Sequence, residues 1–468
     1  MVTSGISINS ILFDTDSYKV SMWKQYPENT EIVFSYISAR KGSVPAVVIE
    51  GANRYVRNVL SQRVTREQVL LAEKFWTAHG EPFNTDGWMY IVEKLGGVLP
   101  LKLRAVPEGT AVPIGNVVAT LENTDPNVPW LTTWMETSLL RAIWYPSSVA
   151  TTSFYIKRMI LEYLEKSGDV SGVDFKLHDF GARGSHSNES ASVGGCAHLS
   201  VFKGTDTSVG IVSAFLDYDA DLFTTGFSIP AAEHSTITSW GRENELDAYV
   251  NQVKKFGKPG AIFAVVSDSY NIFDACVMWA SNPLRKLVQD SGATLVVRPD
   301  SGDPVDVLTS CISILAEGYG FTLNEKGYKV LNTVRFIWGD GINEKSIRRM
   351  YTILVDKLGW SADNFAFGMG GALLGKPQRD DLGWAMKASA IRVNGRWHAF
   401  CKDPVTDPDK KSFKGRVTLY RLADGRWYTG AEDWVEDALD TVYDSGVSTL
   451  IQFEQVRKNV ERSLTEKF

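Results

Sequence analysis

Residues 294–305 read TLVVRPDSGDPV, and this stretch decides the fold. The β-branched and aliphatic run that ends at Arg298 predicts a strand buried on both faces. A polar turn follows, and Asp303 before Pro304 is a helix start signal, because aspartate caps a first turn and proline suits its first position. Strand, polar turn and helix form the unit from which parallel sheets are built.

The same unit recurs on either side of this stretch. Apolar runs that end in polar or glycine clusters are FKLHDFGARG (175–184), AIFAVVSDS (261–269), VRFIWGDG (334–341) and FAFGMGG (365–371). Asn343 with Glu344 opens a further helical pattern. Repetition of this unit over such a length favours a closed, irregular (β/α) barrel over an open sheet.

The flanks of this region have a different texture. The N-terminal part mixes extended and helical segments, which is typical of an α+β domain. The C-terminal part is β-rich, with hairpin signals at Asn394-Gly395 and Asp424-Gly425. We therefore expect two domains. A discontinuous α+β domain is built from both chain ends, 1–149 and 379–468, and it surrounds a central barrel formed by residues 150–378.

Composition excludes several classes of protein. The chain has 468 residues, 44% hydrophobic and 22% charged, which is enough for two or three domains. A net charge of −6 argues against nucleic acid or a membrane surface as partners. We find no secretory leader and no apolar stretch long enough to span a membrane, so we expect a cytoplasmic protein. The four cysteines include no C-x-x-C pair, so we expect neither a zinc site nor a disulfide framework.

Polar residues gather at the predicted strand ends, where barrel enzymes place their active sites. They are Asp179, Phe180, Arg183, Asp268, Arg298, Asp300, Gly339, Asp340, Gly370 and Gly371, joined by Asp206 and His234 from intervening segments. Arginines and glycine N–H groups suit phosphate, whereas aspartates suit ribose hydroxyls or Mg²⁺. The residues by themselves indicate an enzyme that acts on a phosphosugar or a nucleotide.

Each of these residues also has a structural interpretation. An aspartate after a strand often caps the next helix, and glycines often make only a tight turn. A lone histidine such as His234 is more often structural than catalytic. His178 and His198 lie within apolar runs, and we interpret both as core residues.

Eight motifs resemble, in order, those of the nicotinamide phosphoribosyltransferases, over about residues 15–416. They are TDSYKVSMWKQYP (15–27), KLHDFGARG (176–184), FKGTDT (202–207), IPAAEHSTITSWG (229–241), VVSDSYNIFDAC (265–276), RPDSGDP (298–304), WGDG (338–341) and KDPVTDP (402–408). The resemblance implies a barrel enzyme of NAD salvage that joins nicotinamide to phosphoribosyl pyrophosphate, forming nicotinamide mononucleotide and diphosphate.

The resemblance also implies a site for the base. Nicotinamide would stack between Phe180 and Tyr18 of the partner subunit in a homodimer, with Arg298 nearby. Asp206 would accept a hydrogen bond from the carboxamide N–H. A nicotinate carboxylate lacks that N–H and would be repelled, so nicotinamide is the expected substrate.

Further roles concern the phosphates and ATP. The residues expected around the phosphoribosyl and diphosphate groups are Arg183, His234, Arg298, Asp300, Gly339, Asp340 and Gly371, with Arg379 and Lys387 of the partner subunit. His234 resembles the residue that ATP phosphorylates in this family, which would couple optional ATP hydrolysis to synthesis. Asp268 would act near it, through Mg²⁺ or through His234, and Asp300 completes the expected catalytic set.

Three positions depart from the family pattern. Met369 stands where serine is common, Ala182 where tyrosine is common, and Trp338 where vertebrate members have a polar residue. Because a glycine turn binds through its backbone, Met369 would leave phosphate binding intact and change only the handling of ATP. Ala182 changes the outer wall of the expected pocket.

Three alternatives predict different residues. A nicotinate phosphoribosyltransferase would carry a basic or neutral residue where Asp206 lies. A non-catalytic binding protein would have lost Arg298, Asp300 or His234, and all three are present. A barrel hydrolase with His178 and Asp179 as metal ligands would need a second histidine pair, which we do not find.

Overall fold

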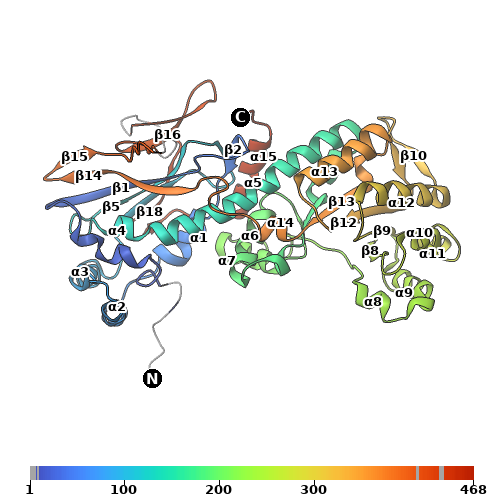
Figure 1. Cartoon of the computed structure of the whole chain (residues 1–468), viewed down its shortest axis with the longest axis horizontal. Helices are drawn as coiled ribbons and strands as arrows, with labels where there is room; N and C mark the ends of the chain where they lie inside the picture. The colour runs from blue at the N-terminus through green and yellow to red at the C-terminus, as the bar shows by residue number, and fades with distance from the viewer. Residues whose placement is uncertain (1–6, 8–9, 407–410, 432–436) are drawn as a thin grey trace. The chain divides into compact units, whose positions relative to one another are not determined.

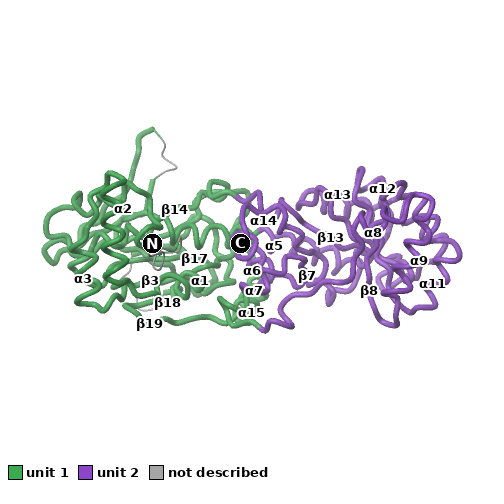
Figure 2. Tube along the Cα trace, turned by 90° about the horizontal axis from the view of Figure 1, so that it is seen from below, with its two compact units in different colours: residues 1–151, 214–220, 378–468 green, residues 152–213, 221–377 purple. Residues whose placement is uncertain are grey.

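The computed structural model describes residue 7 and residues 10–406, 411–431 and 437–468. The chain divides into two compact units (Figure 2). Unit 1 comprises residues 1–151, 214–220 and 378–468, and unit 2 comprises residues 152–213 and 221–377. Unit 1 is thus discontinuous and draws on both chain ends. The short segment 214–220, which the sequence places in the barrel domain, belongs to unit 1.

An antiparallel sheet joins the two chain ends in unit 1 (Figure 1). Its strand order is β15-β14-β1-β5-β3-β18-β19. From the C-terminal part, β14 (Ala385–Val393) pairs with β1 (Thr30–Ser38), and β18 (Asp440–Asp444) pairs with β3 (Leu101–Ala105). The prediction that the last segment packs with the first is therefore confirmed.

The remaining strands of unit 1 are β2 (Ala46–Val48), β4 (Ala111–Pro113), β5 (Val117–Asn123), β15 (Arg396–Ala399), β16 (Val417–Arg421), β17 (Trp427–Ala431) and β19 (Val447–Ser448). Its helices are α1 (Ala52–Tyr55), α2 (Arg66–His79), α3 (Thr85–Leu95), α4 (Leu131–Trp134) and α15 (Phe453–Leu464). Helix α5 (Glu136–Ser167) begins in unit 1 and ends in unit 2. None of the helices described here combines the length and apolar character that a membrane crossing requires.

Tryptophans fill the core of unit 1, as the tryptophan-rich stretch 130–144 suggests. Trp88 packs edge-to-face against Trp130 and Trp134, with ring centroids 5.0 and 5.3 Å apart. Such contacts suit large aromatic rings that must fill a core at high density. The hairpin at Asn394-Gly395 is also confirmed, because both residues have positive φ (49° and 72°), as a two-residue turn between antiparallel strands requires.

Parallel strands form the sheet of unit 2, in the order β7-β6-β13-β12-β9-β8. They are β6 (Leu177–Asp179), β7 (Gly204–Thr205), β8 (Ile262–Val266), β9 (Thr294–Arg298), β12 (Val334–Trp338) and β13 (Phe365–Met369). Each apolar run identified in the sequence contains one of them. The Asp303 side chain caps the helix after β9, as predicted, by accepting hydrogen bonds from the Val305 and Asp306 N–H groups.

Helices and a small hairpin surround this sheet (Figure 1). The helices of unit 2 are α6 (Asn188–Leu199), α7 (Ser208–Tyr218), α8 (His234–Thr238), α9 (Glu245–Phe256), α10 (Ile272–Ala280), α11 (Leu284–Ser291), α12 (Pro304–Tyr319), α13 (Glu344–Tyr351) and α14 (Gly371–Leu374). The end of α7 lies in the segment assigned to unit 1. Strands β10 (Phe321–Leu323) and β11 (Lys329–Leu331) form the hairpin.

An extended segment, 227–232, bridges the two edges of this sheet, and we call it the closing segment. On the β7 side, Phe227 pairs with Gly204, and on the β8 side Ala231 pairs with Ala264. Single parallel bridges thus take the place of a full strand. The predicted irregular barrel is confirmed, with a closure looser than that of a ring of regular strands.

Apolar side chains fill the interior of the barrel. They come from successive strands and from the closing segment: Ala264, Val296, Ile337, Phe180, Ile229 and Ala366. Because side chains alternate along a strand, the neighbouring residues Leu295 and Val297 face the other side, where they are fully buried. The interior is therefore a packed core, and barrel enzymes bind their ligands at the carboxyl end of such a core.

Candidate active site

The carboxyl ends of the unit 2 strands bring the predicted barrel residues together. The residues at this edge are Phe180 and Arg183 after β6, Asp206 after β7, Asp268 after β8, Arg298 and Asp300 at β9, Gly339 and Asp340 after β12, and Gly371 after β13. His234 begins α8, directly after the closing segment. Convergence on one barrel face, on which the sequence interpretation rests, is thus present in the structure.

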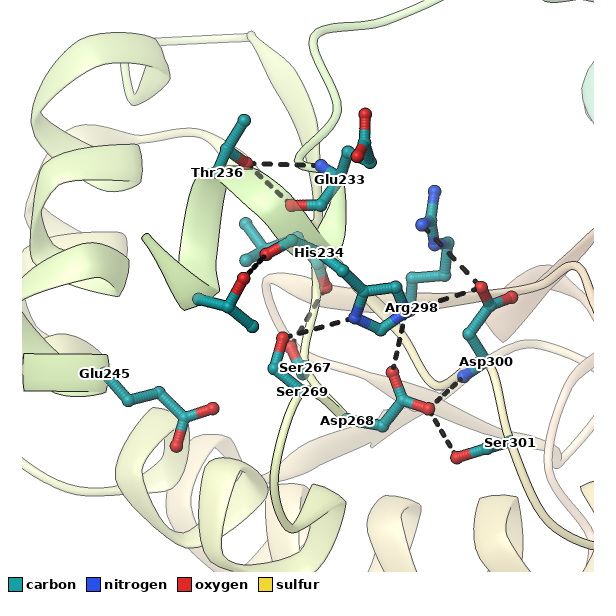
Figure 3. Close-up of polar contacts among 12 residues, drawn as sticks. Glu233, His234, Thr236, Glu245, Ser267, Asp268, Ser269, Arg298, Asp300 and Ser301 are labelled. Atoms are coloured by element: carbon teal, nitrogen blue, oxygen red, sulfur yellow. Dashed lines mark hydrogen bonds and ion pairs between the residues drawn. The ribbon is translucent and has the colours of Figure 1, made fainter. Parts of the chain in front are cut away.

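His234 lies among two aspartates and a serine (Figure 3). Its Nε2 atom is 3.8 Å from Asp268 Oδ1 and 3.8 Å from Asp300 Oδ2. Its Nδ1 atom is 3.3 Å from Ser269 Oγ. The imidazole side chain is 45% exposed, so a soluble ligand can reach it.

Asp268 is held by one of its two carboxylate oxygens. Oδ2 accepts hydrogen bonds from Ser301 Oγ (2.5 Å) and from the Asp300 backbone N–H (3.1 Å). Oδ1, the oxygen that faces His234, is buried without a hydrogen-bond partner. A buried carboxylate oxygen in this state is costly unless a positive group approaches it.

Asp300 lies between positive and negative neighbours. Its Oδ2 atom is 3.9 Å from Arg298 Nη2. Burial raises the pKa of Asp300, the Arg298 guanidinium opposes that rise, and the Asp268 and Asp340 carboxylates add to it. Arg298 Nε is itself buried without a partner. The mouth of the barrel therefore holds more negative charge than its own cations neutralise.

One glycine, Gly368, makes room for the Phe180 ring above the barrel core. The Phe180 N–H donates to the Met369 carbonyl (3.0 Å), which fixes the ring beside β13. A Cβ atom at Gly368 would lie 2.0 Å from Phe180 Cε2, and one at Gly339 would lie 3.5 Å from the same ring and 3.4 Å from Asp300 Oδ1. The ring thus occupies space that only a glycine at position 368 leaves open, and it lies next to Asp300.

We predict that Gly368→Ala displaces the Phe180 ring and weakens binding of a flat aromatic ligand by about tenfold or more, because 2.0 Å is far inside van der Waals contact. The measurement is the KM for that ligand. Gly172→Ala is the matched control, since its Cβ would meet nothing closer than 4.0 Å. An unchanged KM in Gly368→Ala would contradict this role for the glycine.

Asp206 is oriented by the closing segment. Ser228 Oγ donates to Asp206 Oδ1 (2.5 Å), and the Asp206 N–H donates to the Asp179 carbonyl (2.9 Å). Within the part of the chain that the structure describes, Oδ2 accepts no hydrogen bond, and the residue is exposed. One carboxylate oxygen therefore remains available to a ligand. The sequence analysis missed Ser228, because a serine in an irregular segment carries no chemical signal.

The two predicted core histidines differ. His198 is fully buried, with its nitrogens 2.9 Å from Ser153 Oγ and 3.1 Å from the Gly204 carbonyl, so the prediction is confirmed for this residue. His178 is only half-buried. Burial lowers its pKa, and the Asp206 carboxylate opposes that shift. His178 is therefore close enough to the mouth to sense Asp206, and its core assignment was only partly right.

The backbone at Gly184, next to Arg183, lies against the glycine turn after β13. A Cβ atom at Gly184 would lie 2.7 Å from the Gly371 Cα, and one at Gly375 would lie 2.1 Å from the Gly184 carbonyl oxygen. Only glycines allow backbones to approach this closely. Arg183, which is exposed, precedes this backbone contact by one residue.

Three predicted site residues belong to unit 1. Tyr18 lies on the short 3₁₀ helix Ser17–Lys24 and is 61% exposed. Arg379 pairs with Asp380 (2.9 Å), and Lys387, on β14, has its Nζ atom 3.8 Å from Glu136 Oε1. Burial lowers the pKa of Lys387. None of these three residues is part of unit 2, which contains the barrel mouth, and the end of the motif at 402–408 lies outside the described residues.

The departures from the family pattern have local explanations. The Met369 side chain is 3% exposed and belongs to the core, and its carbonyl accepts the Phe180 N–H. Trp338 is also buried, and its Nε1–H donates to the Asp340 carbonyl (2.7 Å), which holds the turn after β12. Ala182 is exposed. The described residues contain no group of three histidine, cysteine or acidic side chains placed to hold a metal.

The fold of unit 2 is an α/β barrel. Basic residues, acidic residues and glycine turns gather at the carboxyl ends of its strands. The model of the nicotinate phosphoribosyltransferase (NAPRTase) family matches residues 175–447. The chain therefore belongs to the nicotinate phosphoribosyltransferase family.

Further similarities are more particular. A model of the nicotinamide phosphoribosyltransferase N-terminal domain matches residues 10–103. A protein of Xanthomonas campestris pv. campestris (strain 8004) named nicotinamide phosphoribosyltransferase is 47% identical, over 94% of this chain and 95% of that protein. A protein of the same name from Acinetobacter baylyi is 30% identical, over 96% of each chain.

Solved structures support the fold. A nicotinate-nucleotide pyrophosphorylase from Pyrococcus furiosus aligns with a TM-score of 0.64 over all of both chains, at 16% identity. Human nicotinic acid phosphoribosyltransferase aligns with a TM-score of 0.56 over 96% of this chain and 93% of that chain, at 15% identity. At these identities the likeness concerns the architecture alone.

Proposed function

We propose that this protein is a nicotinamide phosphoribosyltransferase, which transfers the phosphoribosyl group of phosphoribosyl pyrophosphate to nicotinamide in NAD salvage. The names of its bacterial relatives support the activity. The observation that carries the choice of base is Asp206, a carboxylate with one oxygen held by Ser228 and the other open. An open acceptor suits a carboxamide N–H and repels a nicotinate carboxylate.

The base would lie on the Phe180 ring. An aromatic platform suits the flat pyridine ring, and its position beside Asp300 brings the pyridine nitrogen toward the ribose site. Holding the nitrogen and the ribose carbon close together removes much of the entropic barrier to bond formation. Phe180 and Asp206 together thus fix the plane and the rotation of the base.

The diphosphate would be bound by Arg183 and Arg298, with backbone support from Gly371. When the bond from the ribose carbon to the diphosphate breaks, negative charge grows on the leaving group and positive charge grows on the ribose. Arginines stabilise the first charge, and the Asp300 carboxylate, which would also accept hydrogen bonds from ribose hydroxyls, stabilises the second. Gly339 and Asp340 would engage the ribose and its 5′ end.

A Mg²⁺ ion fits this mouth only as a partner of the substrate. No ready-made cluster of three ligands occurs among the described side chains. Burial raises the pKa of Asp300, and the Asp268 and Asp340 carboxylates raise it further. These carboxylates favour a divalent cation, and Asp340 is the exposed one that would hold it. Mg²⁺ commonly takes one or two carboxylates and completes its shell with water and phosphate oxygens. When bound, it would neutralise charge on the diphosphate.

The residues of unit 1 would complete the site of a second subunit. Tyr18, Arg379 and Lys387 carry an exposed aromatic ring and two cations, which are suited to the second face of the base and to the 5′-phosphate. We predict that mixing inactive Tyr18→Ala subunits with inactive Phe180→Ala subunits restores part of the activity, because a mixed dimer contains one intact site. Failure of the mixture, or full activity of a monomer in sedimentation, would contradict a shared site.

ATP would act through His234. Phosphorylation of this imidazole and later hydrolysis would couple ATP use to synthesis, as the exposed side chain and its carboxylate neighbours permit. Asp268 would be the partner of the imidazole. No step of base transfer requires ATP, so the coupling is optional.

One assay tests the proposed function. The purified protein is incubated with phosphoribosyl pyrophosphate, Mg²⁺ and either nicotinamide or nicotinic acid, and the mononucleotide is identified by mass. We expect nicotinamide mononucleotide, with nicotinate used at least about a hundredfold less efficiently. Preferred formation of nicotinate mononucleotide would support the alternative, a nicotinate phosphoribosyltransferase.

A further inference from the structure

One carboxylate of unit 1 lies between two of the residues proposed to complete the site of the second subunit. Glu136 is in the first turn of α5, and its Oε2 atom accepts a hydrogen bond from Lys19 Nζ (2.7 Å). Its other oxygen, Oε1, is 3.8 Å from Lys387 Nζ. Glu136 therefore joins the short helix that carries Tyr18 to the strand that carries Lys387. The proposed transfer step does not use this glutamate.

Lys19 connects the Glu136 carboxylate to the Tyr18 ring. The Lys19 Nζ atom lies over that ring, 5.1 Å from its centroid. A cation at this distance is attracted by the face of the ring. The Lys19 side chain is only 2% exposed, so its charge needs a partner, and Glu136 provides one. Removal of the carboxylate would leave an uncompensated buried charge next to the ring that is proposed to cover the base.

Other contacts hold the backbone before Tyr18 against the same part of α5. The Thr137 hydroxyl donates to Asp16 Oδ2 (2.7 Å), and the Asp16 N–H donates to the Thr137 hydroxyl (3.2 Å). We expect these contacts to keep the short helix in place when Glu136 is altered. The effect of Glu136 should therefore fall on the Tyr18 side chain, and the fold of the segment should be kept.

Lys387 depends on the same carboxylate for its charge. Burial lowers the pKa of Lys387, and Glu136 opposes that shift. The charged neighbours that lower this pKa further are Arg40, Lys19 and Lys402. A lysine binds phosphate only while it is protonated. Without Glu136, Lys387 would lose its proton, and with it the attraction for phosphate, at a lower pH.

We propose that Glu136 is a positioning residue of the phosphoribosyltransferase site, which holds the Tyr18 ring through Lys19 and holds the Lys387 amine directly. One side chain would thereby set both the group that covers the base and the group that meets the 5′-phosphate. This inference rests on the proposed function, in which unit 1 of one subunit completes the site of the other.

Glu136→Gln tests the contact with Lys387. The amide oxygen can still accept from Lys19, but an uncharged NH₂ group then faces Lys387. We expect the KM for phosphoribosyl pyrophosphate to rise about tenfold, with kcat and the KM for nicotinamide nearly unchanged. The alkaline fall in kcat/KM for phosphoribosyl pyrophosphate should also move to lower pH. If this KM and its pH profile both stayed as in the unaltered protein, Glu136 would have no role at Lys387.

Glu136→Ala and Lys19→Met test the contact with Tyr18. The first variant removes both contacts, so both KM values should rise about tenfold, and the second removes only the cation beside the ring, so the KM for nicotinamide should rise. Glu93→Gln is the matched control, because Glu93 pairs with Arg66 at the surface of the same unit. An unchanged KM for nicotinamide in Lys19→Met would overturn this part of the proposal, even if circular dichroism showed that Glu136→Ala does not fold.

Mixed subunits locate Glu136 within the dimer. Glu136→Ala subunits should regain activity when mixed with Phe180→Ala subunits, because the mixed dimer contains one intact site. They should not regain it with Tyr18→Ala subunits, because both changes then affect the same half of the site. Recovery with Tyr18→Ala would overturn this inference alone. If Tyr18→Ala and Phe180→Ala subunits failed to restore each other, the shared site would fail with it, and an unaltered protein that formed no nicotinamide mononucleotide would overturn the proposed function itself.

Discussion

Replacing His234 with alanine will abolish ATP hydrolysis coupled to synthesis while leaving weak formation of the mononucleotide. We propose the exposed imidazole as the nucleophile at the barrel mouth, and the alanine side chain has no group that can accept a phosphoryl group. We expect the coupled hydrolysis rate to fall by at least about 10³-fold, the scale on which loss of an enzyme nucleophile acts. The measurement is phosphate release from ATP per mononucleotide formed.

A histidine of unit 1 serves as control. His398 lies exposed on β15 in unit 1, so His398→Ala should leave both rates unchanged. Retained coupling in His234→Ala would reject the phosphohistidine. Loss of all synthesis, even at saturating phosphoribosyl pyrophosphate, would mean that His234 serves the transfer step itself.

Replacing Asp206 with asparagine will relax the discrimination against nicotinate by about two orders of magnitude. The asparagine oxygen can keep the hydrogen bond from Ser228, which places the amide NH₂ at the position of Oδ2, the oxygen that would face the base. That group donates to a carboxylate instead of repelling it, so the penalty on nicotinate falls. The measurement is the ratio of kcat/KM values for the two bases.

Two further variants sharpen this experiment. Asp290→Asn alters an exposed carboxylate that pairs with Lys286 on α11, and it should leave the ratio unchanged. Ser228→Ala keeps the charge of Asp206 but frees its rotation, so it should raise the KM for nicotinamide without admitting nicotinate. An unchanged ratio in Asp206→Asn would refute the role of this residue in base selection.

The sequence predicted the barrel strands well because their signal is local. A strand buried on both faces must be apolar along its length, and the polar cluster after it must begin at its carboxyl end, as at Arg298 and Asp268. The carboxyl ends of parallel strands meet at one edge of the sheet. The residues at that edge could therefore be predicted without any knowledge of how the side chains pack. The cap that Asp303 provides for α12 was predictable for the same reason, because it depends only on neighbouring residues in the sequence.

Features that depend on distant contacts were not predictable. The closing segment replaces a strand with single bridges, so it lacks the apolar run that marks a strand. Ser228 and Ser301 matter only through the carboxylates that fold against them. His178 resembled a core residue because its neighbours in the sequence are apolar. Alternate side chains of a barrel strand face the interior, however, and near the end of the strand such a side chain approaches the mouth of the barrel.

Gly368 has a consequence for engineering. In the proposed base site the Phe180 ring packs directly against Gly368, so no smaller residue exists for this position and any larger one would overlap the ring. A library aimed at bulkier or differently charged pyridines should therefore leave this position fixed. The positions to vary are instead Asp206 and Ser228. Both are exposed, so substitutions there leave the buried core unchanged.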